Sequence, residues 1–429
     1  MSSSRPSAYT ALQAASSLLL YQTVLDTDVG DAFLELLQTL HEADYDPQAN
    51  QLACLQAYGR WFHELATHQQ SWPEHLQAQI CIADNPFSRE AQRHPLDALP
   101  DSLVQAARHD LALLQQLAEY DSAKLSAWVQ TIAQMPEPPL VWRSPAAPLS
   151  PWPTQTNWAD DLPALVALYQ QKGIGLFAKY HTVHWYGEFV GIGTPDPVCL
   201  EQLVGYDDQK AQLQQNTEFL LQGLPTLNVL LYGSRGSGKS SLVKALVNHY
   251  HPAGLRLIEV NKSELVSLPL IVNRLRDLPQ KFIIFVDDLS FEESEDDYKT
   301  LKVVLEGNIT ARPPNVVVYA TTNRRHLIRE FFGDRPRPQD GDEIHRWDTV
   351  QEKLSFSDRF GLTLTFEPAS QDTYLQIVHH LAHQAKLAIA PETLEQRALQ
   401  WATRHNGRSG RSARQFIDFV QAEFATQAQ

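Results

Sequence analysis

The chain has 429 residues, 43% of them hydrophobic and 20% charged, with a formal net charge of −15. This composition excludes a disordered or fibrous chain and supplies the cores of roughly two to four domains. Residues 1–200 hold 9 Lys and Arg against 21 Asp and Glu, which excludes a broad nucleic-acid surface there, whereas residues 201–429, with 26 against 29, leave room for a local basic patch.

Three features predict a cytoplasmic protein that makes no contact with a membrane. The chain has no run of about 18 apolar residues, the length that a membrane-spanning helix needs. The first thirty residues lack the basic, apolar and small-residue segments of a secretion signal. The cysteines, Cys54, Cys81 and Cys199, are far apart and odd in number, which indicates reduced thiols.

Residues 1–135 form the first predicted domain, which is all-helical. Runs such as 31–43 and 101–120 repeat apolar residues every three or four positions, as a helix with one buried face does. We see no repeat of about 20–50 residues that would indicate a solenoid. We therefore expect a packed helical domain with no chemistry of its own.

Residues 136–200 are predicted to be a Pro-rich linker and docking segment. Seven prolines lie between Pro136 and Pro153, and each removes a backbone donor and fixes φ, so neither a helix nor a central strand persists there. Because exposed tryptophans are costly, Trp142, Trp152 and Trp158 predict that this arm packs onto a domain. Residues 160–200 are mixed in character and fit a small strand pair or a docking segment.

Residues 201–368 predict an α/β domain, and residues 369–429 a helical lid. Short apolar, β-branched runs alternate with helical stretches, which is typical of a parallel sheet with helices on both faces. Three helical stretches without strands follow, at 370–387, 391–405 and 411–425. The five predicted strands are 227–232, 255–260, 282–286, 315–320 and 362–366.

The strongest functional signal follows the first of these strands. The spacing Gly233-x-x-x-x-Gly238-Lys239-Ser240 fits the phosphate-binding P-loop between a strand and a helix. Glycines allow the tight turn, and backbone N–H groups at the helix start bind phosphate oxygens. We expect Lys239 to reach the β- and γ-phosphates and Ser240 to bind Mg²⁺. The predicted binding residues are Gly233, Ser234, Arg235, Gly236, Ser237, Gly238, Lys239, Ser240 and Ser241.

Polar side chains also end two further strands. Asp287 and Asp288 follow 282–286, at the sheet edge where ligands of open α/β sheets bind. Asp287 is expected to hold Mg²⁺ and Asp288 to orient the attacking water, with Glu292 and Glu293 as fallback bases. Asn323, after 315–320, is predicted to lie between the γ-phosphate and these acids. The alternatives are acids that cap a strand and an Asn that forms a turn.

These elements occur in the order of an AAA+ ATPase module, and the chain resembles this superfamily over residues 200–425. Within it, several strings resemble an uncharacterised bacterial family of AAA+-type ATP-binding proteins. They are VGYDDQK, YGSRGSGKSSLVKAL, DDLSFEE, YATTNRRHLI, SDRFGL, SQDTYLQIV and GRSARQFI.

The resemblance implies an ATP-driven homo-oligomer with nucleotide bound between the sheet domain and the lid. It implies that Val204, Gly205 and Tyr206 border the adenine. Arg359 is expected to face the nucleotide of a neighbouring subunit, and Arg414 to reach the phosphates from the lid. The alternatives are a surface Arg359 paired with Asp358, Arg411 in place of Arg414, and an ordinary basic residue at a helix start.

Two departures from the resemblance shape the functional hypotheses. Hydrolytic relatives more often have Glu at the position of Asp288, whose shorter side chain favours slower hydrolysis. The segment 260–275 has neither the aromatic residue nor the Gly of a threading pore loop. Residues 291–302 are very acidic and would repel DNA phosphates.

Three functions remain open. The leading one is Mg²⁺-dependent ATP hydrolysis that remodels an unknown protein partner bound by the helical domain at 1–135. The second is a nucleotide-gated binding module with little hydrolysis. The third is a DNA-linked loader ATPase, which the acidic front half opposes and the cluster Arg404, Arg408, Arg411 and Arg414 favours.

Overall fold

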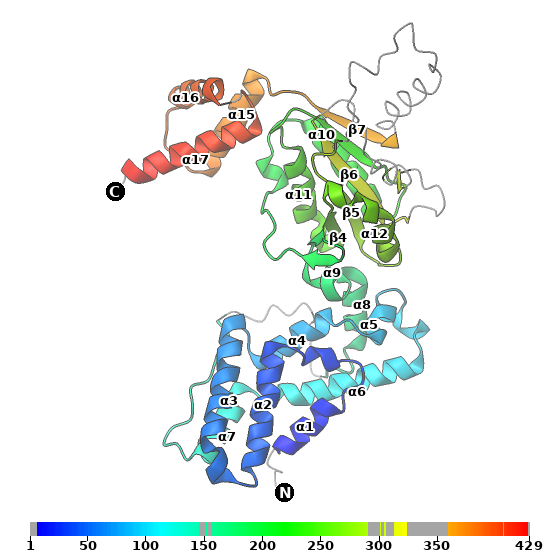
Figure 1. Ribbon diagram of the computed structural model, residues 1–429, viewed down its shortest axis with the longest axis vertical. Helices are drawn as coiled ribbons and strands as arrows, with labels where there is room; N and C mark the ends of the chain where they lie inside the picture. Colours follow the sequence, from blue (N-terminus) through cyan, green and yellow to red (C-terminus); the bar gives the residue numbers. More distant parts are fainter. Residues whose placement is uncertain are drawn as a thin grey trace. The chain divides into compact units, whose positions relative to one another are not determined.

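The computed structural model describes residues 7–145, 152, 157–290, 301, 304–305, 313–323, 359–405 and 407–427. The chain divides into two compact units, Met1–Lys179 (unit 1) and Tyr180–Gln429 (unit 2) (Figure 1). The fallback bases Glu292 and Glu293, and the acidic segment around them up to residue 300, lie outside the described residues.

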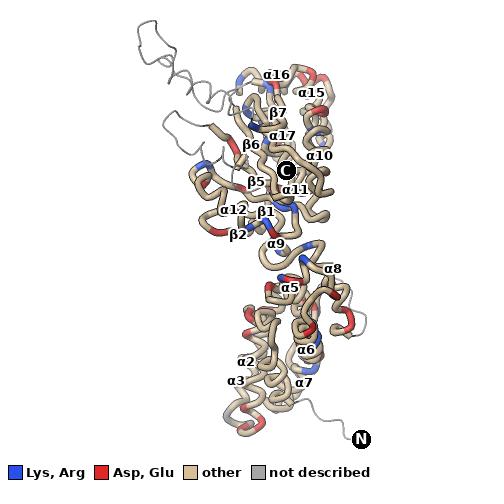
Figure 2. The backbone as a smooth tube through the Cα atoms, turned by 90° about the vertical axis from the view of Figure 1, so that its right-hand side faces the viewer, with Lys and Arg blue, Asp and Glu red and all other residues tan. Residues whose placement is uncertain are grey.

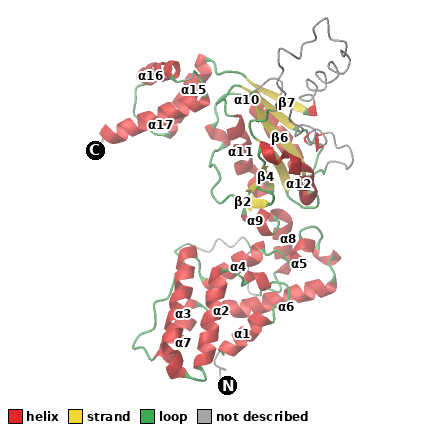
Figure 3. Cartoon of the chain, viewed as in Figure 1, coloured by secondary structure: helices red, strands yellow, loops and turns green. Residues whose placement is uncertain are grey.

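The regular secondary structure in the described part of unit 1 is all helical, with loops between the helices, as Figure 3 shows. Two short 3-10 turns, Gln22–Val24 and Leu96–Ala98, lie between its helices. The helices are α1 (Ala8–Ser16), α2 (Asp28–Ala43), α3 (Pro47–His68), α4 (Trp72–Ile82), α5 (Pro86–Ala91), α6 (Asp101–Ala118), α7 (Ser122–Ala133), α8 (Leu162–Lys172) and α9 (Gly175–Lys179).

The core of unit 1 forms because its helices each bury one apolar face. In α2 the buried positions Phe33, Leu36 and Leu40 recur at the helical period. The Phe33 ring stacks on the ring of Trp72 at 4.0 Å, and both side chains are fully buried. The helix begins after Thr27, whose Oγ1 accepts a hydrogen bond from the Gly30 N–H at 3.0 Å.

The tryptophans of the predicted linker lie within unit 1. Trp152 and Trp158 are 1% and 5% exposed and belong to the same core as the helices. The Trp142 indole N–H donates to the Gln70 carbonyl at 3.1 Å. Together with α8 and α9, these contacts extend the compact unit to Lys179, well past the residue 135 at which the helical domain was predicted to end.

Unit 2 is built on one seven-stranded sheet with the order β2-β1-β4-β5-β6-β3-β7. The predicted α/β fold class is confirmed, since all five predicted runs are parallel strands of this sheet. The sheet also contains two strands that the sequence did not predict as part of it. β1 pairs parallel with β4, and β2 pairs antiparallel with β1. The strands are β1 (Thr182–Trp185), β2 (Phe189–Gly191), β3 (Val229–Gly233), β4 (Leu255–Glu259), β5 (Lys281–Val286), β6 (Val316–Thr322) and β7 (Leu362–Phe366).

The three predicted helical stretches at the end of the chain form the lid. They share a core of their own, in which Tyr374, Val378, Ala398 and Val420 are fully buried. None of the helices in the described part of the chain is long and apolar enough to cross a membrane. The described helices of unit 2 are α10 (Asp207–Leu221), α11 (Lys239–Tyr250), α12 (Leu268–Leu275), α15 (Gln371–Gln384), α16 (Pro391–Arg404) and α17 (Gly410–Gln427), with 3-10 turns at Leu200–Gln202, His251–Ala253 and Lys262–Ser267.

The register of the sheet brings the predicted site segments to one edge. Tyr232 pairs with Thr322, Gly233 with Phe366, and Val286 with Ala320, so β3, β5, β6 and β7 end close together. The P-loop follows β3 and the two acids follow β5. Ligands of parallel sheets bind at this carboxyl edge.

Candidate functional site

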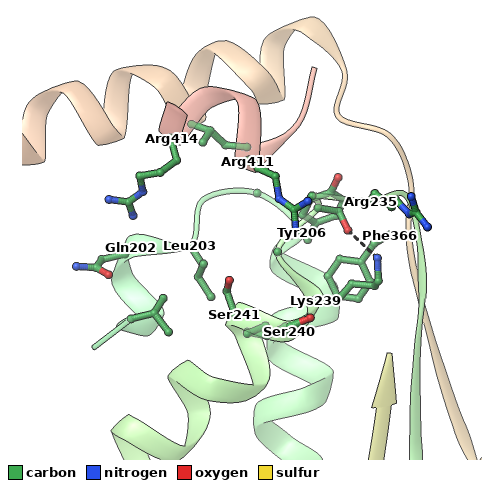
Figure 4. A pocket seen from close by; sticks show the side chains of 18 of the residues that line it. Gln202, Leu203, Tyr206, Arg235, Lys239, Ser240, Ser241, Phe366, Arg411 and Arg414 are labelled. Atoms are coloured by element: carbon green, nitrogen blue, oxygen red, sulfur yellow. Dashed lines mark hydrogen bonds between the residues drawn. The ribbon is translucent and has the colours of Figure 1, made fainter. Parts of the chain in front are cut away.

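A cleft of about 920 Å³ lies at the carboxyl edge of the sheet, between the sheet and the lid of unit 2 (Figure 4). The P-loop, the segment before α10, the acids after β5 and the first turns of α17 all line it. Most of the predicted site residues contribute to its wall: Val204, Gly205, Tyr206, Arg235, Gly236, Ser237, Gly238, Lys239, Ser240, Ser241, Asp287, Asp288, Asn323 and Arg414.

The P-loop takes its shape from glycines that hold positive φ angles. Gly236 and Gly238 have φ of 76° and 91°, in the left-handed region that other residues rarely adopt. At Gly233 a Cβ atom would lie 1.9 Å from the Phe366 carbonyl oxygen, so only glycine fits beside β7. The turn leads the chain to Lys239, the first residue of α11. The N–H groups at such a helix start are suited to bind an anion.

The Lys239 ammonium is held inside the loop. Its Nζ donates to the carbonyls of Gly233 and Ser234 at 3.0 and 2.8 Å, and to Asn323 Oδ1 at 3.1 Å. Burial lowers the pKa of Lys239, and the negative charges of Asp287 and Asp288 oppose this effect. Gly233 and Ser234 therefore act through their carbonyls and do not line the cleft.

Ser240 and Asp287 lie side by side, as a magnesium site requires. Ser240 Oγ donates to Asp287 Oδ1 at 2.6 Å. The same carboxylate oxygen accepts a hydrogen bond from Thr321 Oγ1 at 2.5 Å. Hydroxyl and carboxylate oxygens are the hard ligands that Mg²⁺ prefers, so these two side chains fit that ion.

Asp288 has an unusual backbone conformation, with φ at 51°. Its N–H donates to Thr321 Oγ1 at 2.9 Å, and its Oδ1 accepts from Asn323 Nδ2 at 2.7 Å. A left-handed conformation costs a residue with a Cβ atom about 1 kcal/mol or more and is common at functional sites. Asn323 thus joins Lys239 and Asp288 through one amide group.

Apolar and aromatic groups also line the cleft. Tyr206 has φ at 56°, its hydroxyl donates to the Glu367 carbonyl at 2.5 Å, and its ring lies 5.1 Å from that of Phe366. Ile377 and Leu381 approach from the lid helix α15. This wall suits a flat, largely apolar group such as a nucleobase.

The lid supplies cations. Arg411 and Arg414 extend from α17 into the cleft, Arg411 toward Tyr206 and Arg414 toward Gln202 (Figure 4). The Arg411 N–H also donates to the Gly236 carbonyl at 3.3 Å, which joins the lid to the P-loop.

Arg359 is a predicted site residue that lies outside this geometry. It precedes β7, whose first residue, Leu362, pairs with Val229 at the start of β3. This is the amino end of the two strands, opposite the P-loop, and Arg359 does not line the cleft. Its predicted role on a neighbouring subunit stays a prediction.

The lining residues that the sequence did not indicate include Thr321, Phe366, Ile377 and Leu381. Phe366 ends the last predicted strand at the carboxyl edge, and this position alone could have indicated it. Ile377 and Leu381 lie one helical turn apart, but the same spacing describes an ordinary buried helix face.

One family model and several known proteins match parts of the chain. The model described as "Protein of unknown function (DUF815)" matches residues 177–424, more than half of the chain. The chain is similar to the replication factor C large subunit of Staphylothermus marinus, with 41% identity over 69 residues, 16% of either chain. It is also similar to the ATP-dependent zinc metalloprotease FtsH of Aquifex aeolicus, with 27% identity over 161 residues, 30% of this chain.

The chain spans only 16% and 25% of the length of these two curated relatives. Among solved structures, it is similar to the RuvB Holliday junction branch migration motor of Thermotoga maritima. The TM-score is 0.38 at 17% identity, and the match covers 54% of this chain and 67% of that one.

Proposed function

The chain belongs to the family described as "Protein of unknown function (DUF815)", and we propose that it is an ATP-binding protein that hydrolyses ATP with Mg²⁺. One observation carries the proposal. Lys239, Ser240, Asp287 and Asn323 converge on one cleft beside the start of α11, linked by contacts of 2.6–3.1 Å. A cation, two oxygen ligands and a free helix start in one place suit a triphosphate with its metal ion.

Each residue of the cleft has a separate role in the proposed hydrolysis. Bound ATP supplies the γ-phosphoryl group, and Mg²⁺ neutralises charge that builds up on it. P-loop N–H groups and Lys239 hold the phosphates, while Ser240 and Asp287 hold the metal. Asp288 orients water and accepts its proton, and Asn323 fixes the position of Asp288.

The experiment is a comparison of two lysine variants of the full chain. Lys239→Ala is expected to abolish ATP binding in isothermal titration and to abolish phosphate release. Lys244→Ala is the matched control, because Lys244 lies on the same helix and does not line the cleft. Equal ATP affinity for Lys239→Ala and the wild type would refute the assignment.

A second candidate is a nucleotide-gated binding module with little hydrolysis. The contact between Asn323 and Asp288 supports it, because a carboxylate held by an amide at 2.7 Å is less free to take a proton from water. Steady-state phosphate release separates the two candidates. Rates that stay near background at saturating ATP, together with tight binding, would favour the gated module.

We propose that the helical unit binds an unknown protein partner and that the protein acts as a homo-oligomer, with Arg359 completing the site of a neighbouring copy. A DNA-linked loader is the third candidate. Figure 2 shows acidic residues spread over the helices of unit 1 with few basic ones among them, which opposes a DNA surface there. A salt-dependent DNA titration tests this candidate.

A further inference from the structure

Unit 1 brings three metal-ligating side chains together, and they play no part in the nucleotide cleft. Asp28 lies in the first turn of α2, and Glu64 and His68 lie one helical turn apart at the end of α3. One ligand atom from each residue lies within 4.8 Å of the ligand atoms of the other two. The cluster thus joins the start of one helix to the end of the next.

No other group in the described part of the chain accounts for this arrangement. No hydrogen bond or ion pair to any described residue engages the side chains of Asp28, Glu64 or His68. Two carboxylates that approach this closely repel each other, and a cation between them relieves the repulsion. Asp28 and His68 are exposed and Glu64 is half-buried, so a cation can enter from solvent.

A buried nitrogen next to the cluster also lacks a partner. His75 is 2% exposed, and its ring centroid lies 6.0 Å from that of His68. Its Nε2 contacts Thr27 Oγ1, in the residue before Asp28, at 3.0 Å. Its Nδ1 is buried and finds no hydrogen-bond partner among the described residues. Buried polar atoms are rarely left so, and a water molecule beside His75 is the ordinary way to satisfy this one.

We propose that Asp28, Glu64 and His68 bind a Zn²⁺ ion that clips α2 to α3. One imidazole nitrogen with two carboxylate oxygens is a donor set typical of zinc, whereas Mg²⁺ and Ca²⁺ prefer oxygen ligands alone. Residues four apart on a helix project from one face, so Glu64 and His68 reach the same ion. With three protein ligands, zinc keeps a fourth position for water.

The geometry requires only side-chain movement. Zinc bonds of about 2.0–2.2 Å place tetrahedral ligand atoms roughly 3.3 Å apart, closer than the 4.8 Å limit that the cluster satisfies now. Rotation of the three side chains covers this difference, so the two helix ends need not move closer together.

The test is titration of the untagged full chain with Zn²⁺ alone, without nucleotide. The Asp287→Asn background is used throughout, so that the cleft does not contribute. His68→Ala and Glu64→Gln are expected to weaken zinc binding at least tenfold. His63→Ala is the matched control, because His63 is exposed on the same helix outside the cluster, and it should bind as the parent does.

A second measurement separates a clip from surface binding. Zinc should raise the thermal unfolding midpoint of the parent and of His63→Ala, and leave that of His68→Ala unchanged, because an ion that binds only the folded state stabilises it. Unchanged affinity in both cluster variants, or no saturable binding by the parent, would overturn the proposal.

Discussion

Thr321 offers a direct test of how the sheet positions the acids of the cleft. It is the last residue but one of β6 and is 2% exposed, and its hydroxyl donates to Asp287 and accepts from the backbone N–H of Asp288. Thr321→Val keeps the shape and removes both hydrogen bonds. Thr321→Ser is the control, because it keeps the hydroxyl and loses only a methyl group.

The size of the effect follows from the two bonds. A hydrogen bond to a charged group contributes about 1.5–3 kcal/mol and a neutral one about 0.5–1.5 kcal/mol. Asp287 is exposed, so solvent screening reduces the first figure. We expect Thr321→Val to lower the free energy of unfolding of unit 2 by about 1–3 kcal/mol.

The functional effect should appear in the magnesium dependence. Without Thr321 Oγ1, Asp287 keeps its contacts with Ser240 Oγ and the Asp288 N–H and loses one of the groups that orient it. Loss of a group that orients a metal ligand typically costs about 10–100-fold in metal affinity. Nucleotide binding titrated against Mg²⁺ should therefore shift by about this factor in Thr321→Val and little in Thr321→Ser. The same magnesium dependence in all three proteins would refute the orienting role of Thr321, whatever the change in stability.

Two further outcomes are expected. Arg359→Ala should bind ATP and lose nearly all hydrolysis, because a supplied arginine stabilises the transferred phosphoryl group. Mixing this variant with the inactive Asp288→Asn variant should restore part of the phosphate release. If the subunits exchange and no activity returns, Arg359 acts within its own chain or only holds the fold. Asp110→Ala should destabilise unit 1 by about 3–5 kcal/mol in denaturant unfolding. The reason is that the fully buried Asp110 carboxylate accepts hydrogen bonds from the backbone N–H groups of three successive residues, 19–21. Asp110→Asn should retain part of this stability.

Local patterns predicted the sheet well, because buried parallel strands need continuous apolar runs and the P-loop needs glycines at fixed spacing. They did not assign β1 to the sheet. Its four residues include Thr182 and His184, and its place is decided by the open edge of β4, where Val183 pairs with Ile258 far along the chain. Such a pairing leaves no local signal.

The predicted linker also shows that local sequence patterns do not determine how a segment packs. Its prolines exclude regular structure, yet they say nothing of burial. Trp152 is nearly inaccessible to solvent because the helices of unit 1 leave space for it, and that space depends on residues far away in the sequence. In the site, the position of Asp288 after a strand was predictable, whereas its left-handed backbone depends on Thr321 and Asn323.

The hydrogen bond between the Arg411 N–H and the Gly236 carbonyl has a consequence for nucleotide exchange. A Cβ atom on Gly236 would lie 3.0–3.2 Å from Ser409 and Arg411, so the lid rests directly on the loop backbone. Any swing of α17 must break this contact and alter the loop at the same time. We therefore expect movement of the lid away from the P-loop to weaken phosphate binding. Release of the product and opening of the cleft then occur together.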